Sequence, residues 1–464
     1  MKKIYLLLLA FILVFTNGEL KAQTSKVKYV FFFIGDGMGE AHVNLTEAYL
    51  AQMKDSIGIH HLTMTDFPVM GLSTTFAATR FITGSAAAGT ALATGHKTSI
   101  NTIGLSADRK DTLYSIAYYA HKKGMKVGIL TSVSINHATP AVFYAHQPLR
   151  SQYYQISKQM PLSGFEVFGG GNIYQAKDSS YLLLKQAGYK IVHTYGGFDS
   201  LKNGDGKVYM YAPHTLSEAE MPYVIDRKPG ELTLADFTSK AIELLDNQNG
   251  FFMMVEGGKI DWAAHANDAA TVIKEVIDFD NAIAEAVKFY KQHPDETIII
   301  ITADHETGGL ALGSDLLHYD SNLKLLSKQK HFISYFSDSL ENFIVNNGVE
   351  NFTFDKMNEI AEYFFGVKYE NLNEEQAESL KNAYNSFIKN RKEEQMPYSE
   401  LNKLSVAWLK IFDNMAGVGW TTHSHTGIAV PVRVMGQGQE LFDGFYDNTD
   451  IPKKIGQLIG VDLK

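Results

Sequence analysis

Short apolar runs alternate with amphipathic segments along most of the chain. Four runs rich in β-branched and aromatic residues end in turn residues, which is typical of buried parallel strands: VKYVFFFIGDGMG from Val27, MKVGILTS from Met125, GFFMMVEGG from Gly250 and TIIIITADHETGG from Thr297. Helical patterns lie between these runs, at TLYSIAYYAHKKG from Thr112 and DAATVIKEVIDFDNAIAEAVKFYKQH from Asp268. This alternation predicts an α/β fold, a three-layer sandwich with a large, mostly parallel central sheet and helices on both faces.

The pattern changes from about Asp315 to about Met415. This stretch contains highly charged amphipathic helical patterns, such as NEIAEYFFGVKYENLNEEQAESLKNAYNSFIKNRKEE. The strand pattern returns near Thr421. We therefore predict one catalytic domain over residues 23–464 that carries a helical insertion at about 315–415.

The N-terminus resembles a secretory signal peptide over residues 1–22. Lys2 and Lys3 precede the apolar run Ile4–Phe15, and Leu20-Lys21-Ala22 resembles a cleavage site. The apolar run is too short for a spanning helix, and no later segment has 18 consecutive apolar residues, so we expect no stable membrane insertion. These features predict an exported protein, periplasmic or secreted.

Composition narrows the chemistry further. The 464 residues contain no cysteine, which excludes disulfides and a lipid-modified N-terminal cysteine. A formal net charge of −9 argues against a nucleic-acid-binding surface. Acidic residues in such a protein can instead serve as metal ligands.

Three of the predicted strands each deliver a carboxylate at the carboxyl end. Asp36 follows the first strand, Glu256 ends another, and Asp304 follows a third. A single acid at such a place is usually a turn residue or a helix cap. Three acids at the ligand-binding edge of a parallel sheet favour a shared site.

Histidines near these acids favour a metal centre. Asp261 and His265, at i and i+4 of IDWAAH, share a helix face, although a surface Asp–His pair is the simpler alternative. HSHTG adds His423 and His425, and their spacing leaves open whether one or both bind. Together with Asp36, Glu256, Asp304 and His305, these residues exceed one tetrahedral zinc site and favour two or three metal ions.

Ser85, in FITGSAAAGTALATGHKT, allows two interpretations. It could cap a helix, since serine is a favoured N-cap and the following alanines favour helix. It could also be a nucleophile, because the N-terminus of a helix attracts anions and a nearby metal ion can ionise a hydroxyl. The two roles are compatible, and the ligand cluster favours the nucleophile.

The chain resembles the alkaline phosphatase family in six ordered motifs. These are IGDGMG, GSAAAGTALATGHKT, HATPAVFYAHQPLR, VEGGKIDWAAH, TADHETGG and SHTG. The resemblance covers roughly residues 27–313 and 420–460, and it leaves the helical insertion out. It implies two zinc ions, with a magnesium ion at a third site whose identity the residues leave in doubt.

The family resemblance also implies individual roles. Asp261, His265 and His425 resemble ligands of the first zinc; Asp36, Asp304 and His305 resemble those of the second, with Ser85 beside it. Asp36, Thr139 and Glu256 resemble magnesium ligands, and Arg150 resembles the arginine that binds phosphate. Gly84 stands where many relatives carry an aspartate that helps hold the arginine, and His137 and Trp262 lie at two variable positions near the third metal.

We therefore predict a hydrolase of phosphate monoesters that forms a phosphoserine intermediate on Ser85, and the sequence leaves a homodimer open. One alternative is a related hydrolase of phosphodiesters or sulfate esters; its sulfatase form needs a C/S-x-P-x-R context, and Ser85 is followed by Ala86 and Ala87. The other is a non-catalytic metal-binding protein of the same fold, which would need no nucleophile.

Overall fold

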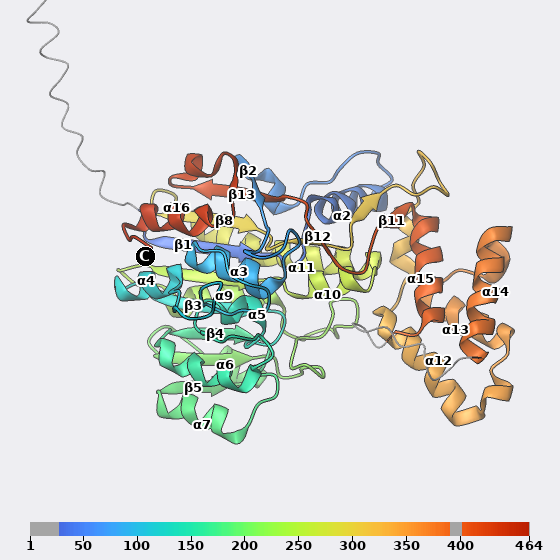
Figure 1. Cartoon of the computed structure of the whole chain (residues 1–464), viewed down its shortest axis with the longest axis horizontal. Coiled ribbons are helices and arrows are strands. Elements are labelled where there is room, and N and C mark those ends of the chain that lie inside the picture. The colour runs from blue at the N-terminus through green and yellow to red at the C-terminus, as the bar shows by residue number, and fades with distance from the viewer. Residues whose placement is uncertain (1–26, 390–400, 464) are drawn as a thin grey trace, which may run out of the picture.

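A ten-stranded, mostly parallel sheet forms the centre of the computed structural model, which describes residues 27–389 and 401–463 (Figure 1). Among the described strands of this sheet, only β13 runs antiparallel to its neighbours. From one edge to the other, the strands are β14 (Gly444–Asp447), β2 (Val69–Thr74), β13 (Val430–Gly436), β8 (Thr297–Thr302), β1 (Tyr29–Ile34), β7 (Phe251–Glu256), β3 (Lys126–Thr131), β4 (Val167–Gly170), β6 (Lys207–Tyr211) and β5 (Tyr189–Val192).

The four predicted strands are neighbours at the centre of this sheet, in the order β8-β1-β7-β3. Their side chains are buried on both faces: Phe31 and Phe33 belong to the core on one face, and Phe32 and Ile34 to the core on the other. The register pairs Ile34 with both Thr302 and Glu256. The carboxyl ends of these strands are therefore level, as the prediction of a shared site requires.

Six strands of the sheet were not identified from the sequence. They are short, or they lack a continuous apolar run, as in the four-residue β4 (VFGG) and in β13 (VPVRVMG), which contains Pro431. Such strands form because the central strands offer edges to pair with, which no local pattern reveals.

Helices cover both faces of the sheet and confirm the α/β class. One core includes α2 (Glu40–Met53), α8 (Tyr195–Asp199), α9 (Leu234–Leu245), α10 (Lys259–His265) and α11 (Ala269–Tyr290). The other includes α3 (Ser85–Thr94), α4 (Ile116–Lys122), α5 (Ala138–Ala141), α6 (Tyr153–Gln159), α7 (Asp178–Gln186) and α16 (Asp450–Ile459). The two predicted helices appear as α4 and α11, which begin after the capping side chains of Ser115 and Asp268.

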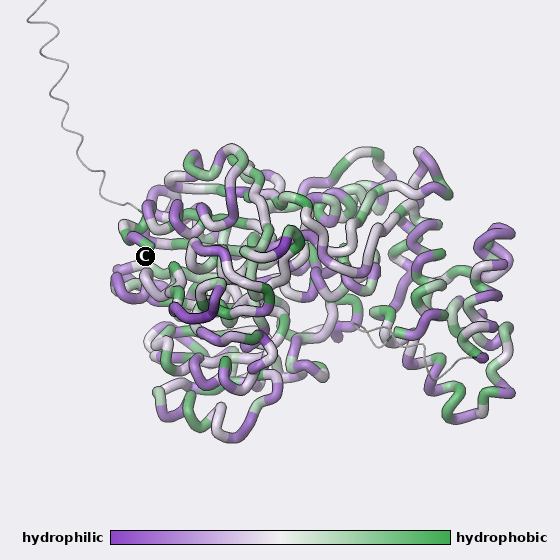
Figure 2. Tube along the Cα trace, in the orientation of Figure 1, coloured by the Kyte–Doolittle hydropathy of each residue, from purple (hydrophilic) through white to green (hydrophobic). Residues whose placement is uncertain are grey.

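The remaining helical block projects from one end of the sheet (Figure 1). It contains α12 (Ile333–Asn347), α13 (Phe354–Phe365), α14 (Glu374–Lys389) and α15 (Lys403–Ala416). Its helices carry hydrophilic and hydrophobic residues in turn (Figure 2), and Phe336, Phe365, Trp408 and Phe412 pack in its interior. We call this block, over residues 315–389 and 401–415, the insertion, and that it is an insertion in the catalytic domain stays a prediction.

Two small antiparallel pairs join the ends of the insertion to the sheet. β10 (Leu310–Leu312) pairs with β11 (Val418–Trp420), and β9 (Glu306–Thr307) pairs with β12 (His425–Thr426). The chain therefore leaves and re-enters the main body at neighbouring points. Short 3-10 helices lie at Thr63–Asp66, Met160–Ser163, Leu323–Lys328, Val349–Asn351, Tyr369–Asn371 and Gln439–Phe442.

The predicted signal peptide, residues 1–22, lies outside the described residues. Within the described part of the chain, none of the helices has the length and apolar character needed to span a bilayer.

Candidate active site

Three carboxylates meet at the level carboxyl ends of the central strands. Asp36 lies two residues after β1, Glu256 is the last residue of β7, and Asp304 lies two residues after β8; all three are fully buried. One oxygen of each, namely Asp36 Oδ1, Glu256 Oε1 and Asp304 Oδ2, has no hydrogen-bond partner. Buried carboxylates with unpartnered oxygens are costly unless a cation compensates them.

The other oxygen of each carboxylate is held by a nearby donor. Asp304 Oδ1 accepts the backbone N–H groups of Gly37 at 3.1 Å and His305 at 2.9 Å. Thr139 Oγ1 donates to Asp36 Oδ2 at 3.2 Å, and the Thr131 hydroxyl donates to Glu256 Oε2. Each carboxylate is thus fixed in place through one oxygen, and the second oxygens of Asp36 and Asp304 lie 3.5 Å and 3.2 Å from His305 Nε2.

Burial, with a further contribution from neighbouring carboxylates, raises the pKa values of these acids. Burial and the neighbouring carboxylates raise the pKa of Asp36 well above its usual range. Burial raises the pKa of Glu256 to about 8 and that of Asp304 to about 7, and nearby carboxylates add to both shifts. Such acids ionise readily near neutral pH only when positive charge lies beside them.

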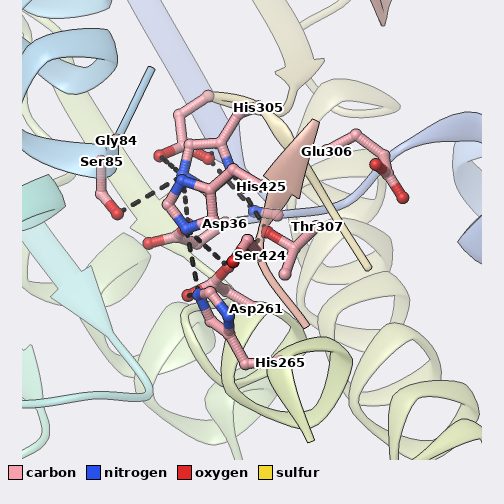
Figure 3. A network of polar contacts seen from close by, with 12 residues as sticks. Asp36, Gly84, Ser85, Asp261, His265, His305, Glu306, Thr307, Ser424 and His425 are labelled. Carbon is pink, nitrogen blue, oxygen red and sulfur yellow. Dashed lines mark hydrogen bonds and ion pairs between the residues drawn. The ribbon is translucent and has the colours of Figure 1, made fainter. Parts of the chain in front are cut away.

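Three imidazoles converge on Asp261 beside this cluster (Figure 3). His265 Nε2 lies 3.5 Å from Asp261 Oδ2, and His425 Nε2 lies 3.6 Å from Asp261 Oδ1. The same two ring nitrogens are 3.0 Å apart, and the His305 ring stacks on that of His425 at 3.7 Å between centroids. Two imidazole nitrogens that face each other this closely are the arrangement that a shared metal ion would hold.

The opposite nitrogen of each ring is occupied by a protein acceptor. Nδ1 of His265 lies 2.6 Å from the carbonyl oxygen of His423, and Nδ1 of His425 lies 2.9 Å from that of Thr83. A carbonyl only accepts, so Nδ1 carries the proton in both rings and Nε2 presents its lone pair to the site.

The Thr307 hydroxyl contacts both Asp261 and His305. It donates to Asp261 Oδ1 at 2.6 Å, and His305 Nδ1 lies 3.3 Å from the same hydroxyl oxygen. This geometry directs the Nε2 atom of His305 into the site. Gly37, at φ +70°, lies beside this pair, where an added Cβ would stand 2.8 Å from both Asp261 Oδ1 and Thr307 Oγ1.

Ser85 is the first residue of α3, and Gly84 is the N-cap. The Ser85 hydroxyl therefore makes no capping bond, and its described contact is with His305 Nε2, at 3.5 Å. The sequence interpretation of Ser85 as the capping residue is wrong, because the chain turns into the helix one residue earlier. The hydroxyl is left free at the start of a ten-residue helix, beside the cluster.

Arg150 reaches the same place from the loop after α5. Its Nη2 lies 2.7 Å from His137 Nε2. Ser85, Arg150, Asp261, His265 and His425 all line one cavity of about 770 Å³. The Ser85 hydroxyl, the Arg150 guanidinium and part of the ligand cluster thus share one cavity.

The donor set fits divalent metal ions. Three groups of side chains each bring potential ligand atoms within 4.8 Å of one another: Asp261, His305 and His425; Asp36, Asp304 and His305; and Asp36, His137 and Glu256. The first two are mixed nitrogen and oxygen sets of the kind zinc accepts. The first contains His305 where the sequence analysis named His265, whose Nε2 lies 3.5 Å from Asp261 Oδ2. The third places His137 where the sequence analysis named Thr139, whose hydroxyl lies beside Asp36.

The structure brings all ten predicted site residues to this edge of the sheet. His423 does not join them: its Nδ1 lies 3.0 Å from the backbone carbonyl of His265, and its side chain lines a different cavity. Thr131 and Thr307 hold predicted ligands through their hydroxyl groups, and Thr83 does so through its backbone carbonyl. These residues were not recognised, since neither a lone threonine nor a backbone carbonyl carries a signal in the sequence.

Comparison with known proteins finds the same family by a family model, by sequence similarity and by structural similarity. The family model described as "Alkaline phosphatase" matches residues 27–461. Alkaline phosphatase 4 of Bacillus subtilis is 32% identical over 445 residues, which cover 93% of this chain and 88% of that protein. The crystal structure of a cold-active alkaline phosphatase from a psychrophilic Shewanella sp. is 30% identical, has a TM-score of 0.78, and covers 93% of this chain and 99% of its own. The alkaline phosphatase of the Antarctic bacterium TAB5 is 26% identical with a TM-score of 0.65, covering 94% of this chain and 99% of its own.

Proposed function

The chain belongs to the alkaline phosphatase family of phosphate monoester hydrolases, and we propose that it acts through a phosphoserine formed on Ser85 at a site for two zinc ions and one magnesium ion. The observation that carries this proposal is the free Ser85 hydroxyl at the start of α3, beside carboxylates whose second oxygens lack partners.

Each residue has a defined part in the proposed reaction. The Ser85 oxygen attacks phosphorus, the bond from phosphorus to the leaving oxygen breaks, and the phosphoryl group is transferred to serine. Water then attacks the phosphoserine and releases inorganic phosphate. Arg150 can hold two phosphoryl oxygens at once, and the N-terminus of α3 favours the negative charge.

Metal ions would be held by the described donor groups. We assign the first zinc to Asp261, His265 and His425, the second to Asp36, Asp304 and His305, and the magnesium to Asp36, Thr139 and Glu256. When bound, these ions would lower the pKa of the serine hydroxyl and stabilise negative charge on the reacting oxygens. Structures of the TAB5 enzyme in which a histidine is replaced by aspartate or glutamate have Mg bound in the M3 site, which supports magnesium as one of the family's ions.

The decisive experiment combines metal analysis with trapping of the intermediate. The purified protein should contain zinc and magnesium, and it should become phosphorylated on Ser85 during turnover of an aryl phosphate at acidic pH. Ser85→Ala should keep its metal content and lose the label. Label on another residue would refute the assignment, and faster hydrolysis of a diester than of the matched monoester would favour the phosphodiesterase alternative.

We also propose that residues 1–22 are a signal peptide and that the protein is exported, to the periplasm or beyond. The basic start and the apolar run at Ile4–Phe15 support this proposal. N-terminal sequencing of the exported protein should begin at Gln23. An intact N-terminus on exported protein would refute it.

A homodimer through the outer edge of the sheet is our proposal for the assembly. Leu72 of β2 and Phe445 of β14 are register partners there, 41% and 66% exposed, and Met70 beside them is 55% exposed. Contiguous exposed apolar side chains often mark an interface. Light scattering should give a dimer for the wild type and a monomer for Phe445→Lys.

A further inference from the structure

Aromatic side chains line much of the cavity around Ser85. Four of its lining residues are Tyr153, Tyr223, Trp262 and Phe332, and the lining also includes the charged side chains of Arg80 and Glu218. Its volume of about 770 Å³ is in the range of sites that bury a drug-sized ligand, and it far exceeds the needs of a phosphoryl group. The remaining space is available to the leaving group of the substrate.

Tyr223 and Phe332 form a stacked pair in this lining. Their rings stack with centroids 3.9 Å apart and an interplanar angle of 20°. The ammonium of Lys259 lies 3.4 Å from the centroid of the Tyr223 ring, so it must occupy the face opposite Phe332. With both faces of Tyr223 covered, only its edge and its hydroxyl remain to face the cavity.

Lys259 ties this stack to the proposed metal ligands. It is fully buried in α10, two residues before Asp261, and its Nζ donates to the carbonyl oxygen of Met221 at 2.5 Å. The loop that carries Tyr223 is thus fastened to the helix that carries Asp261 and His265.

Phe332 lies in the insertion, directly before α12, and hydrogen bonds hold the backbone in place at this point. Asp226 accepts the Phe332 N–H at 3.2 Å and contacts His331 Nδ1 at 2.7 Å. The buried carboxylate of Asp268 accepts the Ile333 N–H at 3.1 Å. The helical block therefore contributes a firmly held ring to the catalytic cavity.

The hydroxyl of Tyr223 adds a polar group to this pair of stacked rings. Tyr223 is 7% exposed, yet among the described residues its hydroxyl has no hydrogen-bond partner. This hydroxyl oxygen is not one of the buried unpartnered atoms of the described residues, so it reaches the solvent of the cavity, where a ligand could contact it.

We infer that the Tyr223–Phe332 stack is the leaving-group wall of this enzyme and selects phosphate monoesters whose leaving alcohol carries a planar aromatic ring close to the ester oxygen. This inference rests on the proposed function, because it takes the phosphoryl group to lie between Ser85 and Arg150. Aromatic pairs prefer offset-stacked or edge-to-face contacts, and a ring next to the ester oxygen would meet the wall in this way.

Two matched substrate pairs test the wall. For wild type and Phe332→Ala, kcat/KM is measured with phenyl phosphate and ethyl phosphate, and binding of phenylphosphonate and methylphosphonate is measured by calorimetry. We expect Phe332→Ala to lower the phenyl-to-ethyl ratio of kcat/KM, and the corresponding ratio of affinities, by about fivefold to tenfold. The kcat/KM for ethyl phosphate and the affinity for methylphosphonate should change less than about twofold, because the ethyl and methyl groups do not reach the wall.

Phe364→Ala is the matched control, since Phe364 is also in the insertion and is 5% exposed, against 6% for Phe332, but does not line the cavity. It should leave both ratios unchanged. Phe332→Leu keeps most of the volume and serves if the alanine variant does not fold; it should lower the ratios in the same direction.

Equal losses for the phenyl and ethyl compounds, or unchanged ratios in a folded variant, would overturn the wall and leave the phosphoserine mechanism standing. A wild type that forms no phosphoserine would instead refute the proposed function, while the two phosphonates would still measure the wall.

Discussion

Nη2 of Arg150 lies 2.7 Å from Nε2 of His137. The guanidinium can only donate, so His137 accepts through Nε2 and its ring is neutral. Burial and the charge of Arg150 lower the pKa of His137 to about 3, which agrees with this role. Next to the serine, Gly84 has no side chain to support the arginine, and an added Cβ there would meet only His425, at 3.9 Å. We therefore propose that His137 supports the phosphate-binding arginine.

His137→Ala should loosen Arg150 and weaken inhibition by inorganic phosphate. A hydrogen bond with a charged donor contributes about 1.5 kcal/mol or more, and we expect part of this loss to reach the phosphate, so the inhibition constant should rise about fivefold. His121→Ala, a half-buried histidine paired with Glu166, is the control and should have no effect. Unchanged inhibition in the His137 variant would show that Arg150 is held by other groups.

Arg150→Lys should weaken phosphate inhibition more strongly. A lysine presents one point charge, whereas arginine can hold two phosphate oxygens in a fixed plane. We expect a loss of about tenfold or more in both phosphate affinity and kcat/KM, measured by product-inhibition kinetics. If phosphate inhibits this variant as strongly as the wild type, Arg150 is not the phosphate clamp.

Removal of metal should lower the melting temperature. Without cations, the buried carboxylates of Asp36, Glu256 and Asp304 repel one another. Because the folded state raises the pKa of Asp304 to about 7 and that of Glu256 to about 8, the cost of these two groups grows as the pH rises from about 4 toward those values. Saturating metal at about 100 times the Kd stabilises by about 2.7 kcal/mol. Calorimetry should show a drop after chelation and recovery with zinc and magnesium. An unchanged melting curve after verified metal removal would contradict a metal site here.

Thr307→Val should weaken metal binding while keeping the shape of the side chain. The variant loses the donor that holds Asp261 Oδ1 at 2.6 Å. Loss of a group that orients a metal ligand typically costs about tenfold to a hundredfold in affinity. Competition with a zinc chelator measures the change. Thr421→Val, which removes a hydroxyl bonded to the Gly309 carbonyl, should bind zinc like the wild type.

Glu275→Gln should change how stability depends on pH. Glu275 Oε1 accepts the Val224 N–H at 2.8 Å, and burial raises the pKa of this carboxyl to about 7 despite the nearby Lys259 and Arg227, with Asp278 adding to the increase. The folded state therefore holds the proton more tightly than the unfolded state. The stability of the wild type relative to the variant should fall by about 3 kcal/mol as pH rises from about 4.5 to about 7, and then stay level. Urea unfolding of both proteins across this range gives the free energy of unfolding of each. A wild type that becomes more stable relative to the variant as pH rises would contradict the assignment.

The central strands and the shared site of this protein could be predicted from the sequence alone. Continuous apolar runs predicted the strands β1, β3, β7 and β8, because strands buried on both faces need no polar alternation. The position of Asp36, Glu256 and Asp304 at the ends of such runs predicted the shared site, since parallel strands place their carboxyl ends at one edge. The peripheral strands escaped prediction, because their pairing depends on neighbours rather than on local pattern.

The contacts that orient the site residues could be recognised only in the folded protein. His425 rather than His423 faces the site, because the extended segment β12 begins only at His425 and the chain bends at His423 and Ser424. The partner of Arg150 and the stack of Tyr223 on Phe332 join residues that lie 13 and 109 positions apart. Contacts of this kind follow from the packing of loops onto the sheet, and neither periodicity nor spacing along the chain encodes which side chains will meet.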